Sequence, residues 1–265
     1  MDTTLFYRFL IASLFLFFVV FKKGERLKIN KEEFMVLGAL GLFYGLSSDL
    51  LFLGYDYLSA GIASTILFVY PVIVALIMVF YFREKLRTST IYSLFLSLAG
   101  VYVLSTQNSW TDIRFGGLFI TLGSALFYAL YIITVNKARL KISGWKMTAY
   151  SLFFTSIYYL AKILFKQETL VLPDIDFFLN LTSFAFITTV ISTSALVYAI
   201  KYIGSTPTAI LGALEPVVAV IVSVVLFQED MTQNLLIGVI LILVGVIIHI
   251  LGDSRKSKSH PTPQE

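Results

Sequence analysis

Glu215 is the residue whose type and position most directly suggest chemistry, because its carboxyl group stands in the middle of an otherwise apolar segment. If that segment crosses a membrane, a charge there costs about 2.5–3.5 kcal/mol on insertion scales, which favours a functional reason for its presence. Two interpretations follow. Glu215 binds a substrate amine or exchanges a proton, or it is a protonated acid that hydrogen-bonds a neighbouring helix and fixes the packing.

The same chemistry has a counterpart 145 residues earlier in the chain. Sliding the sequence along itself by that offset places Tyr70-Pro71 on Glu215-Pro216, so an internal repeat sets a phenol opposite a carboxyl group across an expected central cavity. Proline removes a backbone donor and disrupts the turn before it, which frees a carbonyl able to hold a solute. Pro71 and Pro216 are therefore expected to be hinges or kinks.

A second polar group is the triplet Ser47-Ser48-Asp49, which the same offset places on Ser192-Thr193-Ser194. Hydroxyl groups in apolar helices serve close helix packing or line a polar cavity. We expect Asp49, Ser192 and Thr193 to belong to a polar cavity wall, as candidates for binding the substrate or a proton. The alternative for Asp49 is a place near the membrane surface, where water hydrates it.

Other recurring positions favour structural roles. Tyr57 and its repeat partner Tyr202 stand at predicted helix ends, where an aromatic belt at the membrane interface is expected. Glu84 and Glu229 precede predicted helices, whose N-terminal dipole a carboxylate stabilises. Arg8 stands near the start of the first apolar run, from where its long side chain reaches the headgroups.

Enzymatic and metal-dependent functions lack the residues that they need. The chain has no cysteine and only two histidines, and it contains neither an HExxH motif nor a Gly-rich phosphate loop. We therefore expect no catalytic residue, no metal site and no cofactor.

The composition is that of a membrane protein. Hydrophobic residues make up 58% of the 265 residues and charged residues 14%, with a mean hydropathy of +0.86, whereas a soluble domain needs far more polar surface. A membrane-spanning helix needs about 20 apolar residues to cross a hydrocarbon core about 30 Å thick. Nine such runs predict an all-α polytopic membrane protein, with spans at 5–21, 34–54, 60–82, 88–106, 115–136, 147–165, 177–199, 205–227 and 233–252.

Basic residues indicate the orientation of these spans. Sixteen of the 20 Lys and Arg residues lie in alternate loops and the C-terminal segment, whereas Arg8, Arg114 and Lys166 lie on the other side and Lys162 lies inside its span near the outer end. Cytoplasmic loops are enriched in basic residues. In a plasma (cell inner) membrane, the C-terminus is thus expected in the cytoplasm and the N-terminus of this chain outside. The same distribution accounts for the net charge of +4 without a nucleic-acid partner.

The repeat predicts how the spans are organised. The first four spans match the last four, while the fifth, at 115–136, has no partner. We expect an inverted repeat of five-helix units, with four helices in a first half at 1–106, five in a second half at 115–252, and a disordered cytoplasmic tail at 253–265. A partner for the fifth helix would lie before Met1, so the repeat predicts that a helix precedes this start or has been lost.

These motifs, in this order, resemble those of the drug/metabolite transporter superfamily, in its EamA-like branch. The first copy reads Tyr57, Pro71-Val72, Glu84 and Gly100-Val101, and the second reads Tyr202, Glu215-Pro216-Val217, Glu229 and Gly245-Val246. Arg8 in Phe-Tyr-Arg-Phe-Leu-Ile-Ala is similar to the family's Arg that opens its second helix. The resemblance implies a ten-helix transporter fold with both ends in the cytoplasm, of which this chain lacks the first helix.

The sequence therefore predicts a secondary carrier, an exporter of small metabolites that works by alternating access. Acidic groups within the spans, with no basic residue near the midplane, favour neutral, zwitterionic or cationic solutes such as amino acids over phosphorylated ones. Two alternatives stay open: a non-transporting membrane scaffold or accessory subunit derived from a carrier, and an importer on the same fold. The expected partners are the solute and the lipid bilayer, and a homodimer is left open.

Overall fold

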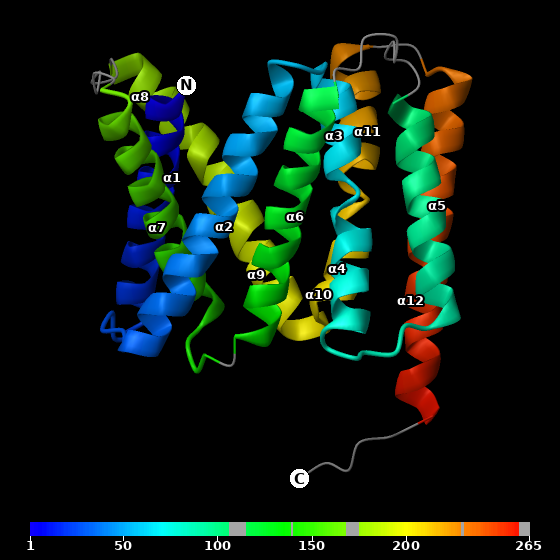
Figure 1. Ribbon diagram of the computed structural model, residues 1–265, viewed down its shortest axis with the longest axis horizontal. Coiled ribbons are helices and arrows are strands. Elements are labelled where there is room, and N and C mark those ends of the chain that lie inside the picture. The colour runs from blue at the N-terminus through cyan, green and yellow to red at the C-terminus, as the bar shows by residue number, and fades with distance from the viewer. Residues whose placement is uncertain (106–114, 139, 168–174, 229–230, 260–265) are drawn as a thin grey trace. The chain divides into compact units, whose positions relative to one another are not determined.

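The computed structural model describes residues 1–105, 115–138, 140–167, 175–228 and 231–259, and every regular element in these ranges is helical (Figure 1). Counted across short breaks, eight segments are long and apolar enough to cross a membrane, and Thr88–Leu104 is a shorter apolar helix. All nine predicted spans therefore coincide with apolar helices. The prediction of an all-α, multi-pass membrane protein is confirmed.

Six predicted spans form single helices, and three are divided. The single helices are α1 (Asp2–Lys22), α2 (Lys31–Tyr55), α5 (Thr88–Ser105), α6 (Phe115–Lys137), α7 (Gly144–Phe165) and α12 (Gln233–Ser259). The divided spans form α3 (Ala60–Leu67) with α4 (Tyr70–Phe80), α8 (Ile175–Ala185) with η2 (Phe186–Ile191) and α9 (Ser192–Ile203), and α10 (Ser205–Gly212) with α11 (Glu215–Phe227). The tail predicted from residue 253 is described as far as Ser259, as part of α12.

Two of the divisions lie at equivalent places in the repeat. Pro71 is the second residue of α4 and Pro216 the second of α11. A proline ring clashes with the carbonyl four residues earlier and offers no N–H to it. Those carbonyls belong to Leu67 and Gly212, the last residues of α3 and α10, so each helix ends where its proline requires it to.

The third division is a π-helical turn, η2, between α8 and α9. The sequence predicted one continuous helix at 177–199, because a π-helical turn leaves no hydropathy signal. π-Helical turns are rare and often stand at functional sites. In this one, Thr189 and Val190 are buried.

The helices group into two compact units, and neither unit coincides with one copy of the repeat. Unit 1 comprises Met1–Asp49 and Leu130–Ser205, and unit 2 comprises Leu50–Ala129 and Thr206–Glu265. In unit 1, α1 packs along α7, its repeat equivalent. Asp2, the first residue of α1, contacts Lys162 and Lys166 at the C-terminal end of α7. The two helices are therefore antiparallel, as an inverted repeat requires.

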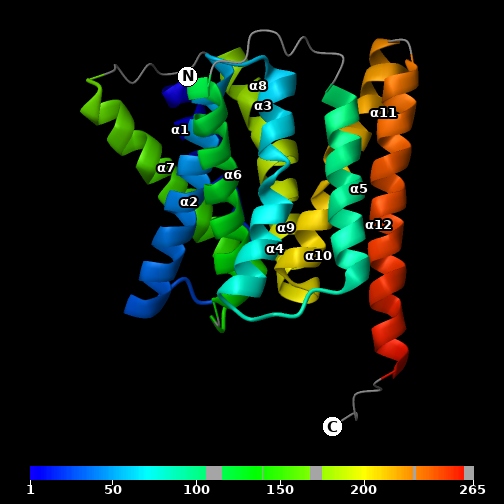
Figure 2. The same ribbon diagram turned by 45° about the vertical axis from the view of Figure 1, so that its right-hand side comes forward.

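Unit 2 contains the other pair of repeat equivalents, α5 and α12, which lie side by side in both views (Figures 1 and 2). A Cβ placed on Gly100 would lie 2.7 Å from the carbonyl oxygen of Gly238, and one on Gly238 would lie 2.9 Å from that of Gly100. The two backbones therefore touch. Such close approach through glycine is how helices associate where the surrounding lipid is as apolar as the helices themselves.

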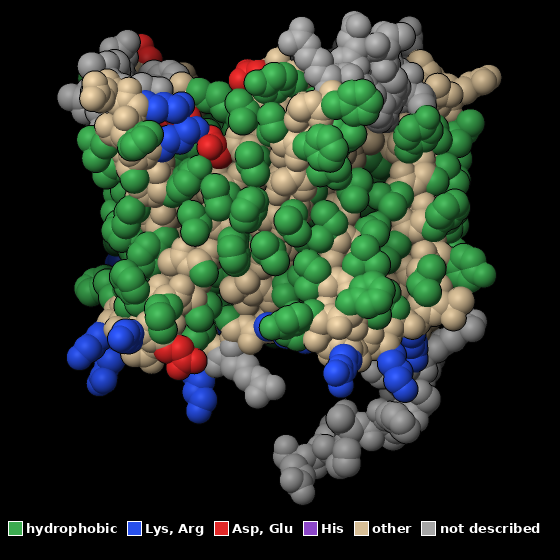
Figure 3. Space-filling model, viewed as in Figure 1, with side chains coloured by type: hydrophobic (Ala, Val, Ile, Leu, Met, Phe, Trp, Pro, Cys, Tyr) green, Lys and Arg blue, Asp and Glu red, His purple; other side chains and the backbone are tan. Residues whose placement is uncertain are grey.

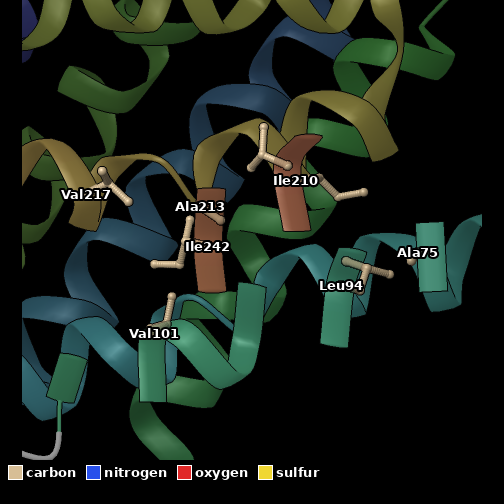
Figure 4. Close-up of a cluster of buried hydrophobic side chains, with 8 residues drawn as sticks. Ala75, Leu94, Val101, Ile210, Ala213, Val217 and Ile242 are labelled. Atoms are coloured by element: carbon tan, nitrogen blue, oxygen red, sulfur yellow. The ribbon is translucent and has the colours of Figure 1, made fainter. Parts of the chain in front are cut away.

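A buried apolar cluster connects these helices with the divided spans of unit 2. Figure 4 shows its side chains converging from α4, α5, α10, α11 and α12. The buried members are Ala75, Leu94, Val101, Ile210, Ala213, Val217, Ile242 and Val246. On the face shown in Figure 3, hydrophobic side chains cover the helices along their lengths, and the visible charged side chains lie near the helix ends.

Close packing in unit 1 yields a matched pair of substitutions in α2. A methyl group added at Gly41 would lie 2.8 Å from the Ser151 carbonyl oxygen on α7, whereas one added at Gly38 would meet nothing within 4 Å. We expect Gly41→Ala to lower the melting temperature of the purified protein, and Gly38→Ala to leave it unchanged or raise it, since alanine favours a helix over glycine by about 0.5–1 kcal/mol. Thermal unfolding in detergent measures both. Equal melting temperatures would contradict the close approach of α2 and α7.

Candidate functional site

The predicted partners Glu215 and Tyr70 lie near each other in unit 2. The carboxylate of Glu215, in the first turn of α11, and the hydroxyl of Tyr70, the first residue of α4, are close enough to interact electrostatically. A Cβ placed on Gly212 would collide with the Tyr70 hydroxyl, so the phenol of one repeat copy lies against the end of α10 in the other. Both groups therefore stand at the divisions that the prolines cause.

The two groups differ in their surroundings. Tyr70 is 2% exposed, and its ring meets that of Tyr128 edge to face with the centroids 4.7 Å apart. Glu215, by contrast, is exposed, although it lies inside the candidate span Ser205–Val222. The phenol is fixed by packing, whereas the Glu215 residue is exposed at the surface of the protein. Pro71 is buried beside Tyr70, and Pro216 is partly buried.

Asp49 belongs to a charged cluster in unit 1, which the sequence did not predict. The ammonium group of Lys162 on α7 contacts the Asp49 carboxylate on α2 and lies 3.2 Å from the carboxylate of Asp2 on α1. Tyr158 donates a hydrogen bond of 3.0 Å to the second oxygen of Asp49, and Lys166 lies 2.9 Å from Asp2. One lysine thus connects three helices through two carboxylates.

The charged cluster is shielded and rests on aromatic rings. The side chains of Lys162 and Asp49 are each 22% exposed, that of Asp2 only 7% and that of Lys166 46%. The Lys162 ammonium also lies 5.9 Å from the ring centroid of the buried Tyr159. Partial burial makes these ion pairs stronger than surface pairs, because water screens them less.

Arg8 does not reach a carboxylate among the residues that the structure describes. Its Nε donates a hydrogen bond of 2.7 Å to the hydroxyl of Thr189 in η2, and its guanidinium lies 5.0 Å from the ring centroid of Phe184. The hydrogen bond attaches α1 to the π-helical turn, with Thr189 fully buried.

The hydroxyl triplet of the second copy begins directly after η2. Ser192 is exposed and donates its hydroxyl to the Thr188 carbonyl at 2.5 Å. Thr193 and Ser194 are each 2% exposed, and their hydroxyl oxygens have no hydrogen-bond partner within the described ranges. Only the first of the three hydroxyls therefore lies at the protein surface.

The remaining predicted positions are dispersed. Tyr57 is exposed in the turn after α2, and Tyr202 is exposed in the last turn of α9, where its ring stacks on that of Tyr198. Glu84 is exposed between α4 and α5, one residue after Arg83, whose φ is 55°. Glu229 lies outside the described residues.

Sequence reasoning missed the partners of Asp49. Lys162 was placed inside its span near the outer end without a partner, and Asp2 was placed outside the first span, because that span was expected to begin at residue 5. The structure starts α1 at Asp2 and pairs both residues. The available signal was an acidic residue at the start of α1 and basic residues at the end of α7. This signal carries meaning only once α1 and α7 are known to be antiparallel neighbours.

The family model described as EamA-like transporter family matches residues 1–106 and 115–251. The uncharacterized transporter YvbV of Bacillus subtilis (strain 168) is 25% identical over 248 residues, which cover 91% of this chain and 79% of YvbV. An uncharacterized transporter of Archaeoglobus fulgidus is 29% identical over 186 residues, covering 70% of this chain and 65% of that protein.

A solved crystal structure, described only as that of a protein, superposes on this chain with a TM-score of 0.81. The two sequences are 18% identical, and the superposition covers 96% of this chain and 88% of the other. At that identity the similarity shows a shared fold.

The charged cluster predicts an unequal effect of removing its two lysines. Lys162→Met leaves Asp49 without a cation and should cost on the order of 1–3 kcal/mol of stability, between the values for surface and buried pairs. Lys166→Met removes a more exposed charge and should cost less. Because a neutral amide at position 49 needs no counter-ion, the double variant Asp49→Asn/Lys162→Met should unfold at a higher temperature than Lys162→Met alone. A double variant that unfolds at a lower temperature than Lys162→Met alone would contradict the pairing of Asp49 with Lys162.

Proposed function

This chain belongs to the EamA-like transporter family, and we propose that it is a secondary carrier that moves small metabolites across the membrane by alternating access. The observation that carries the proposal is the position of Glu215, an exposed residue inside a candidate span and at a helix division, with a buried phenol from the other repeat copy nearby. Discontinuous helices at equivalent repeat positions are typical of carrier binding sites.

Each part of this arrangement has a role in the proposed site. Glu215 binds the amine of a solute or exchanges a proton for it, since a carboxylate in a span is retained for a function. Tyr70 is held in one position by Tyr128 and provides a hydroxyl that orients the solute. Pro71 and Pro216 act as hinges, because they separate short helices that have no shared hydrogen-bond ladder across the division.

The charges support a neutral, zwitterionic or cationic solute, with amino acids and related amines as the leading class. A phosphorylated solute requires Arg or Lys at its site. In the part of unit 2 that the structure describes, no salt bridge or hydrogen bond joins a basic side chain to Glu215 or Tyr70. In unit 1, the two carboxylates of the charged cluster are already paired with lysines, so Glu215 is the better candidate for the solute and Asp49 the second.

Transport by a single variant tests the role of Glu215. Proteoliposomes loaded with a mixture of the twenty proteinogenic amino acids are placed in the same radiolabelled mixture, and counterflow is followed. We expect wild-type protein to exchange label and Glu215→Gln to lose at least about tenfold in rate, because one charge-assisted contact contributes about 1.5–3 kcal/mol. Glu32→Gln, the same change at an exposed residue in the first turn of α2, is the control.

Three results would count against the proposal. Equal rates for Glu215→Gln and wild type would remove Glu215 from the site. Exchange that is absent for wild type, with amines and with neutral solutes alike, would favour a membrane scaffold or accessory subunit. Label that accumulates only in the inward direction under a proton gradient would favour an importer over the exporter that the sequence predicts.

We further propose a plasma membrane location, with the C-terminus in the cytoplasm and the N-terminus of this chain outside. Because the sequence has no cysteine, single cysteines report the side directly. We expect a membrane-impermeant maleimide to label Asp56→Cys on intact cells and Lys23→Cys only after permeabilisation, since both positions are exposed, Asp56 directly after α2 and Lys23 in the segment that joins α1 to α2. The reverse pattern would overturn this orientation.

A further inference from the structure

The charged cluster of unit 1 forms a row of ionisable groups that leads from a helix end into a candidate span. The row begins at Lys166, which directly follows α7 and whose side chain is 46% exposed, and continues through Asp2 and Lys162 to Asp49. Asp49 lies six residues before the last residue of α2, roughly 9 Å along the helix at 1.5 Å per residue. Rows of ionisable groups inside membrane spans are typical of proton pathways.

The two carboxylates of the row have unequal numbers of basic partners. Asp2 lies 3.2 Å from the ammonium group of Lys162 and 2.9 Å from that of Lys166. Among the residues that the structure describes, Asp49 forms a salt bridge with Lys162 alone. If Asp49 becomes neutral, Lys162 therefore keeps Asp2 as its partner, and this lysine is not left as an unpaired cation in its span.

A proton and the Lys162 ammonium compete for the same carboxylate of Asp49, because a protonated carboxyl group no longer attracts a cation. Tyr158 donates a hydrogen bond of 3.0 Å to one oxygen of Asp49, and Lys162 contacts the other. A protonated carboxyl group has one O–H and keeps its capacity to accept hydrogen bonds. The oxygen that Lys162 contacts is therefore free to take a proton once Lys162 withdraws, while Tyr158 continues to donate to the other.

The surroundings of Asp49 single it out as the group that gains the proton. In the described part of unit 1, the ionisable groups that face it are Lys162, Tyr158 and Tyr159 on α7 and, beyond Lys162, Asp2 on α1. Phenols and ammonium groups hold their protons at neutral pH, so only the two carboxylates can gain one. The side chain of Asp49 is 22% exposed and that of Asp2 7%, so Asp49 is the more accessible of the two.

We propose that Asp49 is the proton-binding site that couples transport to a proton gradient, with Lys162 as its competing partner, an inference that rests on the proposed transport function. In one state Lys162 contacts both carboxylates. In the other, Asp49 carries a proton and Lys162 stays with Asp2, which releases α2 from α7. The proton comes from water on one side of the membrane and leaves to water on the other when Lys162 returns, and the ammonium group keeps its own protons throughout.

This assignment gives the solute and the proton separate sites. Glu215 in unit 2 binds the solute, and Asp49 in unit 1 binds the proton. Loss of the proton site should therefore affect transport that a proton gradient drives more than it affects the exchange of solute for solute. That difference separates coupling from solute binding.

Two rates measured on the same proteoliposomes test the proposal. One is counterflow of the radiolabelled amino acid mixture without a pH gradient, and the other is accumulation of the same label under a proton gradient imposed in each direction in turn. We expect wild-type protein to show both. In Asp49→Asn, the ratio of gradient-driven accumulation to counterflow should fall at least about tenfold, within the range of about 5–150-fold that is typical of coupled sites.

Matched variants locate the effect. Asp56→Asn, the same change at an exposed position directly after α2, should keep the wild-type ratio. Asp49→Glu retains a carboxyl group and should keep more of the ratio than Asp49→Asn does. Asp2→Asn removes the other carboxylate of the row and should lower the ratio less than Asp49→Asn, whereas Glu215→Gln should lower both rates.

Proton exchange by the purified full chain gives a second readout, which a merely structural role of Asp49 would not change. The amino acid mixture is added to the protein in weakly buffered detergent solution, and a pH indicator follows the protons. We expect wild-type protein and Asp2→Asn to exchange protons with the solution when solute binds, and Asp49→Asn to exchange none.

The outcomes that would overturn this proposal differ from the one that would overturn the transport function itself. Counterflow by wild type without any gradient-driven accumulation would leave the carrier in place and remove the proton. An unchanged ratio in Asp49→Asn, or equal losses in Asp49→Asn and Asp2→Asn, would show that Asp49 is not the proton site. Absence of counterflow in wild type would reject the carrier, and the coupling with it.

Discussion

Hydrocarbon offers neither a hydrogen bond nor a counter-charge, and this constraint governs how the helices are held together. Lys162 satisfies it by contacting Asp2 and Asp49, and in doing so connects α1, α2 and α7. Arg8 satisfies it in part through Thr189. Because lipid also removes the hydrophobic drive for helices to associate, these polar contacts and close backbone packing remain as the forces that join them. The glycines at Gly41, Gly100 and Gly238 permit that packing.

The two compact units show how an inverted repeat is used. In each unit a helix packs against its own repeat equivalent in the antiparallel sense, α1 with α7 and α5 with α12. Neither compact unit coincides with one copy of the repeat. A charge at the start of one helix therefore meets a charge at the end of its equivalent, which is why Asp2 lies beside Lys166 although 164 positions separate them.

The candidate transport site follows from the same symmetry. Pro71 and Pro216 end the helices before them, so both copies carry a division at the same position. The copies differ in the residue that each division presents, which is a buried tyrosine at Tyr70 and an exposed glutamate at Glu215. Gly212 leaves room for the Tyr70 hydroxyl, so a glycine of one copy positions the phenol of the other. A duplicated framework thus holds two chemically different groups near each other.

The sequence by itself determined the class of fold, the nine apolar spans and the inverted repeat, because hydropathy and residue offset are properties of the chain alone. It also drew attention to Pro71, Pro216, Glu215 and Asp49. Only the tertiary structure decided that Asp49 is paired with Lys162, that Arg8 is bound to Thr189 rather than to a carboxylate, and that a π-helical turn interrupts the seventh span. These depend on which helix faces are neighbours. Hydropathy does not encode that choice, since lipid-facing and protein-facing sides of such helices are equally apolar.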